Sequence, residues 1–254
     1  MEPITSRRNP LIAHIRALGS DGDYRRERRE FVCAGVKALR EAAASGAEVT
    51  AIVSCSGTDA PRVGGTVAVS AAREVLQTAS PFNNPRDVLF VCRMPDAPFA
   101  PGRRDLRVIL ENIQDPGNLG AIIRAADAFE IGEVVMTGAC ADLYNPKTVR
   151  ASTGAIFRQR VVSMTAPEIS GLKANGVKIY GAAADGGIGV REAELSGAAV
   201  AIGNEGCGLS RELRGLCDGA VSIPMSPAAE SLNAAVAAAI IMWECFASQT
   251  RRRE

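Results

Sequence analysis

The first ninety residues combine hydrophobic positions of two kinds. Apolar residues at helical spacing predict helices over 9–18, 36–46 and 71–79. Short apolar runs bounded by turn residues predict strands over 30–35, 48–55, 65–70 and 87–93. This alternation predicts a small α/β unit. Residues 94–105 then contain Pro95, Pro98, Pro101 and Gly102 without any periodicity, which predicts a linker.

A second series of strands and helices follows the linker. Apolar runs predict strands over 106–112, 133–138, 177–184, 198–204 and 219–225. Helical spacing predicts helices over 118–129, 145–155 and 229–249. Strands that alternate with helices favour a parallel sheet with helices on both faces. Ligands of such sheets bind beyond the carboxyl ends of the strands, so the residues after each strand are the candidates for a site.

Composition and charge narrow the class of protein. The 254 residues are 47% hydrophobic and 22% charged, with a net charge of +1, as in a soluble globular protein. Seven scattered cysteines include no CxxC pair, so we expect neither a disulfide framework nor a metal site. The polar N-terminus and the lack of a long uninterrupted apolar run predict a cytoplasmic protein without a membrane segment. Arginines crowd the first thirty residues; they either contact nucleic-acid phosphates or form a solvated surface paired with Glu27 and Glu30.

The first polar strand end reads ENIQDPGNLGAIIRAADAF, residues 111–129. Pro116 and Gly117 predict a turn between the strand and the helix. Asn118 is either a functional residue or a simple cap of that helix. Arg124 lies among apolar and small residues, either in a functional role or as an amphipathic side chain that reaches solvent.

The second polar strand end is the loop GNEGCG, residues 203–208. The loop departs from the dinucleotide fingerprint G-x-G-x-x-G, and no Lys-Ser/Thr pair follows it as in a P-loop. Glu205 would repel a phosphate, so the glycines indicate exposed backbone groups that hold a neutral or cationic ligand. The alternative is a glycine turn in which Glu205 caps the next helix near its N-terminus.

The third polar strand end reads SIPMSPAAESLNAAV, residues 222–236. Pro224 and Pro227 fix a rigid loop, and Ser231 and Asn233 then open a helix rich in Ala, Val, Ile and Met. Both polar residues are candidates either for a site or for capping of that helix. A helix this apolar must be buried in the core or against another subunit.

Together, these three stretches resemble the SpoU (TrmH-type) family of RNA 2′-O-ribose methyltransferases in the SPOUT superfamily. The matching text is NIQDPGNLGAIIRAADAF, AIGNEGCGLS and IPMSPAAESLNAAVAAA, with NPKTVRASTGAIFR after the first motif. The resemblance covers roughly residues 106–248. It implies an α/β fold in which a small α/β RNA substrate-binding domain, residues 1–93, and the linker 94–105 precede a knotted methyltransferase domain, residues 106–254. That second domain would hold a parallel sheet and a deep trefoil knot.

The resemblance also implies a cofactor and a partner. Family members bind S-adenosylmethionine in the knot and work as homodimers through the knotted domain. The family's cofactor contacts match Gly203, Asn204, Ile223, Met225 and Leu232 here. A sulfonium cation tolerates a nearby acid, which agrees with the presence of an acidic residue in the second loop.

By resemblance, the catalytic residues are Arg124, Asn118, Glu205, Ser231 and Asn233. The reaction moves a methyl group from sulfonium to a ribose 2′-oxygen, which is a poor nucleophile until its proton is removed or its oxygen is polarised. Family accounts give the arginine a base-like role, although a free guanidinium stays protonated. Two roles are therefore open for Arg124: an unusual base, or a cation that stabilises a phosphate and the developing alkoxide.

The resemblance leaves the substrate and two rival functions to be weighed. We expect structured RNA, with ribosomal RNA preferred because the layout resembles 23S rRNA methyltransferases; transfer RNA is the alternative. A non-catalytic RNA-binding protein on the same fold is disfavoured by the five catalytic candidates. A dehydrogenase-like enzyme is disfavoured by the failed glycine fingerprint. The sequence departs from the family at Glu130, where glycine is frequent, and over residues 80–87.

Overall fold

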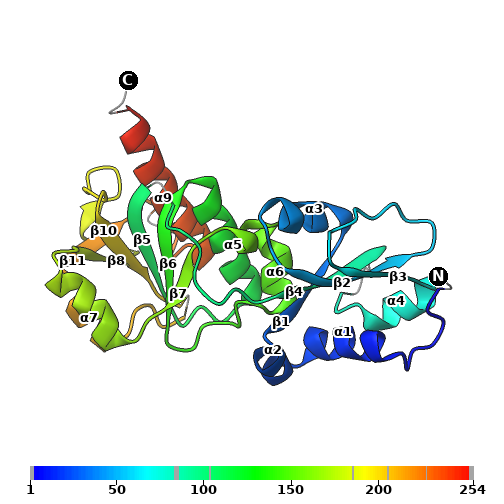
Figure 1. The fold of residues 1–254 in the computed structure, drawn as a ribbon. Helices are drawn as coiled ribbons and strands as arrows, with labels where there is room; N and C mark the ends of the chain where they lie inside the picture. Colours follow the sequence, from blue (N-terminus) through cyan, green and yellow to red (C-terminus); the bar gives the residue numbers. More distant parts are fainter. Residues whose placement is uncertain are drawn as a thin grey trace. The chain divides into compact units, whose positions relative to one another are not determined.

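The computed structural model describes residues 3–82, 86–102, 104–184, 186–204, 206–226 and 228–251. The chain forms two compact units, which Figure 1 shows in sequence colours. One unit comprises residues 1–97 with 142–157, and the other comprises residues 98–141 with 158–254. To the predicted division the structure adds one feature: residues 142–157 pack with the first unit. The functions assigned to the two domains stay predictions.

The first unit is built on a four-stranded mixed sheet with the strand order β1-β4-β2-β3. Its strands are β1 (Glu30–Ala34), β2 (Val49–Cys55), β3 (Val67–Ala71) and β4 (Val88–Arg93). Its first helices are α1 (Pro10–Ser20), α2 (Gly22–Arg28), α3 (Val36–Ala44) and α4 (Arg73–Ala79). All the predicted strands and helices of this unit are confirmed. Helix α2 was not predicted, because its sequence GDYRRER has no apolar periodicity.

The segment 142–157 completes the first unit. It contains helix α6 (Pro146–Ser152) and a short 3-10 turn (Ala155–Phe157). The predicted helix over 145–155 ends early because Thr153, with φ of 50°, and Gly154, with φ of 92°, are left-handed. The Phe31 ring on β1 contacts the rings of Tyr144 and Phe157, with centroids 4.6 and 6.2 Å away, so aromatic packing holds the segment to the sheet.

The second unit is built on a seven-stranded sheet in which all pairings are parallel, as predicted. The strand order is β7-β6-β5-β10-β8-β11-β9. The strands are β5 (Arg104–Glu111), β6 (Ile131–Thr137), β7 (Val161–Ser163), β8 (Ile179–Ala183), β9 (Ile188–Gly189), β10 (Ala198–Ile202) and β11 (Gly219–Ser222). The five predicted strands are confirmed. Strands β7 and β9 span only three and two residues, too short for a hydrophobic pattern to mark them.

Helices of the second unit cover both faces of its sheet. They are α5 (Pro116–Ala128), α7 (Ala166–Ala174), α8 (Arg211–Leu216) and α9 (Ala234–Arg251). Ile169 of α7 and Leu213 of α8 pack with Ile109 and Val135 of the sheet. Side chains alternate along a strand, so the fully buried residues that flank Ile109 and Val135 in β5 and β6 point to the opposite face of the sheet. On that face, α5 packs against β6 and against α9 (Figure 1).

Two local features of this unit bear on the predictions. The last helix begins at Ala234 rather than at residue 229, because the Asn233 side chain accepts the N–H groups of Ala235 and Val236 at 3.0 and 3.3 Å. Residues 229–233 therefore precede the helix. Glu130, where the family often has glycine, has φ of 55°, a conformation that glycine adopts more easily. Within the described ranges, none of the helices combines the length and apolar character needed to cross a membrane.

Candidate functional site

Asn112 connects the carboxyl ends of three neighbouring strands. Strand β5 lies between β6 and β10, and Asn112 directly follows β5. Its side-chain Oδ1 accepts the N–H of Ala139 after β6 at 2.7 Å. Its backbone oxygen accepts the Asn204 side chain after β10 at 3.2 Å. Asn112 has φ of 57°, and this backbone turn lets one residue hold the loops after β6 and β10 together.

The glycine loop after β10 closes on itself. The Asn204 side chain accepts the N–H of Gly206 at 2.8 Å, and the Asn204 carbonyl accepts the N–H of Gly208 at 2.8 Å. A Cβ atom at Gly203 would overlap the backbone of Gly208 and Leu209. Gly203 is therefore required for this close approach of backbone to backbone, not for a phosphate cradle.

The loop ends at helix α8, which is capped by Ser210. The Ser210 hydroxyl accepts the N–H of Leu213 at 3.1 Å, and the Ser210 N–H donates to the Glu111 carboxylate at 2.7 Å. Glu111 is buried at the end of β5 and was not a predicted site residue. Glu205 lies outside the described residues, so its predicted catalytic role and the capping alternative stay predictions; the cap of α8 observed in the structure is Ser210.

A cavity of about 220 Å³ lies where β8, β10, β11 and α9 meet. The five predicted cofactor-binding residues all line it: Gly203, Asn204, Ile223, Met225 and Leu232. Ser231 lines the cavity as well. The remaining lining residues are small or apolar: Ala182, Ala183, Ala184, Ile202, Gly208, Val221, Ala234, Ala237 and Ile241.

The chemistry of this cavity selects against anionic ligands. None of its described lining residues is basic, and Asn204 and Ser231 supply its only polar side chains within the described chain. A phosphate would lack counter-charges there, whereas a ligand with an apolar body fits the apolar wall, and the side-chain oxygens of Asn204 and Ser231 are available to a cationic centre. The non-helical segments around Gly203, Ile223 and Leu232 also offer backbone donors and acceptors. The donor set thus fits S-adenosylmethionine.

Two predicted catalytic residues contact each other directly. The Asn233 side-chain amide donates to the Asn118 side-chain oxygen at 3.1 Å. Asn118 belongs to the first turn of α5, and Asn233 caps α9. The alternative that Asn118 caps α5 is wrong, because Asp115 is the cap and its Oδ1 accepts the Asn118 N–H at 2.8 Å. The Asn118 side chain therefore connects the start of α5 to the start of α9 through its hydrogen bond with Asn233.

Arg124 lies on the exposed side of α5. Its neighbours Ile122 and Ile123 are fully buried, so the helix turns the arginine away from the core. It is six residues after Asn118, which is about 9 Å along the helix axis. In the part of the chain that the structure describes, Arg124 forms no ion pair, and it does not line the cavity. This exposure fits both interpretations, contact with an RNA phosphate and simple solvation.

Sequence reasoning missed three contributors at this edge of the sheet. Glu111 and Asn112 organise the loops, and Ala182–Ala184 form part of the cavity wall. The polar pair Glu111–Asn112 after an apolar run was a visible signal, but no partner could be assigned to it. Cys140 also lies at this edge; burial raises the pKa of its thiol, which donates to the Leu110 carbonyl at 3.3 Å.

An apolar surface on α5 and α9 is open to solvent. Ala121, Ala235, Val236, Ala239, Ile240 and Trp243 line a shallow hollow of about 410 Å³. Val236 is 47% exposed and Trp243 is 50% exposed. The apolar residues of α9 were predicted to be buried in the core or against another subunit. The structure places this part of the helix outside the core of its own unit.

The chain is similar to a group of RNA methyltransferases. Residues 105–243, more than half of the chain, match the model of the SpoU rRNA Methylase family. The 23S rRNA (guanosine(2553)-2′-O)-methyltransferase RlmP of Bacillus subtilis is 40% identical over 161 residues. These residues make up 63% of this chain and 64% of RlmP, so the chain spans just under two thirds of that relative.

Two further similarities extend over nearly the whole chain. The 23S rRNA (uridine(2479)-2′-O)-methyltransferase of Streptomyces viridochromogenes is 34% identical over 260 residues, which cover 95% of this chain and 90% of the relative. The crystal structure of the SpoU methyltransferase AviRb from the same organism, in complex with the cofactor AdoMet, is 30% identical. It superimposes with a TM-score of 0.84 over 96% of this chain and 99% of AviRb.

Proposed function

Because the chain belongs to the SpoU rRNA methylase family, we propose that it transfers the methyl group of S-adenosylmethionine to a ribose 2′-hydroxyl of RNA, with ribosomal RNA as the substrate. The observation that carries this proposal is the cavity whose wall contains all five predicted cofactor residues and no described basic residue. The names of the two relatives, both 23S rRNA 2′-O-methyltransferases, support the substrate class.

The cavity residues bind and orient the cofactor in this proposal. Gly203, Ile223 and Leu232 supply backbone groups, and Asn204 and Met225 complete the wall. When bound, the cofactor supplies an electrophilic methyl group on a sulfonium. The apolar wall excludes water from that centre, so the protein favours transfer to a positioned ribose over hydrolysis.

The polar residues beside the cavity orient the ribose. Ser231 lies in the cavity wall, and the Asn118–Asn233 pair holds the starts of α5 and α9 together next to it. Arg124 either takes the 2′-hydroxyl proton or stabilises a substrate phosphate and the developing alkoxide as a cation. A pH–rate profile distinguishes these roles: the base role predicts that Arg124→Ala abolishes a rate-controlling ionisation, and the cation role predicts a lower rate with an unchanged profile. Unchanged turnover in Arg124→Ala would exclude both roles.

We further propose a cytoplasmic homodimer with a trefoil knot in its second unit. The apolar surface of α5 and α9 supports the dimer, because exposed Val236 and Trp243 would be buried against the same surface of a second copy. The similarity to AviRb over the whole chain supports the knot. A ribosomal substrate implies a cytoplasmic location.

The proposed activity is tested with RNA from a strain that lacks the gene. The protein is incubated with this RNA and S-adenosylmethionine carrying a trideuterated methyl group, and the RNA is separated into ribosomal and transfer fractions and digested to nucleosides. The expected result is one trideuterated 2′-O-methylnucleoside in the ribosomal fraction. Label in the transfer RNA fraction alone would show that transfer RNA, not ribosomal RNA, is the substrate. Absence of label from RNA that the protein binds would favour a non-catalytic RNA-binding protein.

A further inference from the structure

A second cavity, of about 500 Å³, lies wholly within the first unit. It is formed by the end of β1, the first turns of α3, Phe82, residues 86–88 and residues of the segment 149–157. Its volume is within the range of pockets that hold a molecule the size of a nucleotide. None of the residues proposed for methyl transfer lines it.

The cavity has an excess of positive charge. Lys37, Arg86 and Arg150 line it, and all three are exposed at its surface. Among the residues that the structure describes, none of the three forms an ion pair. Two acidic residues, Glu41 and Asp87, also line the cavity, so its cations outnumber its acids by one. Asp87 forms an ion pair with Arg73, which lies 2.9 Å away and outside the lining. These cations are therefore available to an anionic ligand from solvent.

The Arg150 guanidinium group lies over the Phe82 ring in this wall. The Arg150 guanidinium carbon is 5.2 Å from the centroid of the Phe82 ring. Planar groups of both kinds are surfaces on which single-stranded nucleic-acid bases stack. Lys37 belongs to the first turn of α3, whose N-cap Gly35 provides no side-chain acceptor, so the helix adds partial positive charge to the same wall.

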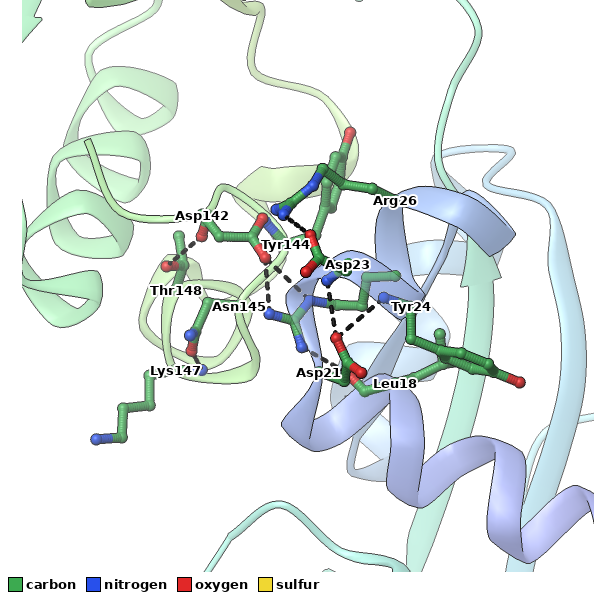
Figure 2. Close-up of polar contacts among 11 residues, drawn as sticks. Leu18, Asp21, Asp23, Tyr24, Arg26, Asp142, Tyr144, Asn145, Lys147 and Thr148 are labelled. Carbon is green, nitrogen blue, oxygen red and sulfur yellow. Dashed lines mark hydrogen bonds and ion pairs between the residues drawn. The ribbon is translucent and has the colours of Figure 1, made fainter. Parts of the chain in front are cut away.

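The position of Arg150 is fixed by the anchoring of its segment. Asp142, labelled in Figure 2, precedes α6. Its carboxylate accepts two hydrogen bonds from the Arg25 guanidinium at 2.7 and 2.9 Å. The Asp142 backbone oxygen accepts the Thr148 hydroxyl of α6 at 3.1 Å. The Asn145 side chain accepts the N–H of Lys147 and caps the helix. The ion pair and the helix cap thus hold the backbone of α6, which carries Arg150, in place beside the cavity.

We propose that this cavity binds one unpaired nucleotide of the RNA substrate, with its base against Phe82 and Arg150 and its adjoining phosphates against Lys37 and Arg86. The inference rests on the proposed function, because that function makes RNA the polyanionic substrate of this protein. An aromatic ring beside several exposed cations fits a nucleotide within a chain better than an isolated phosphate. The first unit then selects the substrate by holding an unpaired nucleotide, while the second unit carries the chemistry.

Binding of a fluorescein-labelled 12-nucleotide oligouridylate, measured by anisotropy on the full chain, tests the proposal. The lining variants are Arg150→Ala, Phe82→Ala and Lys37→Ala. The matched control is Arg40→Ala, which removes an exposed cation from the same helix α3 outside the cavity lining. We expect affinity to fall roughly 5- to 100-fold for Phe82→Ala and Arg150→Ala, as for loss of a base-stacking surface. Lys37→Ala should reduce the salt slope of binding by about one.

Several outcomes would overturn the proposal. Equal affinities of Arg150→Ala and Arg40→Ala would show that the cavity is not used, and Arg150 is exposed, so its replacement leaves the fold intact. Displacement of the oligouridylate by equimolar uridine monophosphate would show a site for free nucleotides rather than RNA. A 4-thiouridine oligomer should crosslink to the peptide that contains Phe82 or Arg150; crosslinks only to the second unit would contradict the proposal. If the wild type methylates RNA while the lining variants bind the oligouridylate with normal affinity, only the cavity inference fails. If the lining variants lose affinity for the oligouridylate but the wild type methylates no RNA, only the proposed function fails.

Discussion

The ion pair between Arg25 and Asp142 should be the most sensitive point of the first unit. Arg25 is 4% exposed, and its Nη1 also donates to the Leu18 carbonyl at 2.7 Å. Asp142→Ala leaves the buried guanidinium with two unpaired donors, so we expect a loss of about 3–5 kcal/mol in the free energy of unfolding. Arg25→Met leaves Asp142, whose side chain is 25% exposed and still accepts the Tyr144 N–H, so the loss should be only about 1–3 kcal/mol.

The assay is urea unfolding followed by circular dichroism, with hydrogen exchange to locate the change. The exposed pair Arg26–Asp23 on α2 provides the control, because Asp23→Ala should cost at most about 1 kcal/mol. In the double variant Arg25→Met/Asp142→Ala neither charge is left unpaired, so its loss should be smaller than the sum of the single losses by at least about 1 kcal/mol. Exchange should accelerate in residues 10–34 and 142–157. Additive single losses, or a larger effect of Arg25→Met than of Asp142→Ala, would refute this reasoning.

Other predictions test the site, the proposed interface and the partly buried phenol of Tyr144. Gly203→Ala should weaken S-adenosylmethionine binding at least tenfold by calorimetry, because its Cβ meets backbone, whereas Gly206→Ala meets only a side-chain atom at 3.3 Å and should change affinity less than threefold. Asn233→Ala removes the cap of α9, so thermal unfolding should show a loss of about 1 kcal/mol, and methyl transfer should fall as well; unchanged rates would remove Asn233 from the catalytic set. Val236→Glu should convert the proposed dimer to monomers in sedimentation, and a wild type that already sediments as a monomer would contradict the proposed interface. Burial raises the pKa of Tyr144 to about 12, above its unfolded value of about 10, so the stability it contributes is present below pH 10 and should be lost, by about 3 kcal/mol, between pH 10 and 12. Ultraviolet absorbance should show a late tyrosine titration that Tyr144→Phe removes.

Long and regular hydrophobic patterns in the sequence predicted most of the fold. Strand β5 was predicted from the apolar residues within 106–110, and helix α5 from apolar positions at helical spacing over residues 118–129. Helix α2 escaped because its buried residue is an arginine, whose burial depends on Asp142 more than a hundred positions later. The start of α9 was placed too early because residues 229–233 are compatible with a helix until Asn233 caps the following turn.

The candidate site was less accessible to sequence reasoning than the fold. The polar strand ends could be identified individually, and the charge of Glu205 already argued against a phosphate. Their convergence depends on the strand order β5-β10-β8-β11, which no local pattern encodes. The family resemblance supplied the cofactor residues, and the structure places all five around one cavity. The small residues Ala182–Ala184 carry no chemical signal, so their part in the wall appears only in three dimensions.

The central claim is that the cavity beside Gly203 holds a cationic methyl donor rather than a phosphate-bearing nucleotide. Isothermal titration calorimetry with S-adenosylmethionine and, in parallel, with NAD tests this claim most directly. We predict one saturable site per chain for S-adenosylmethionine, weakened at least tenfold in Gly203→Ala, and no heat of binding with NAD. Binding of NAD, or no binding of S-adenosylmethionine to the folded protein, would contradict the account.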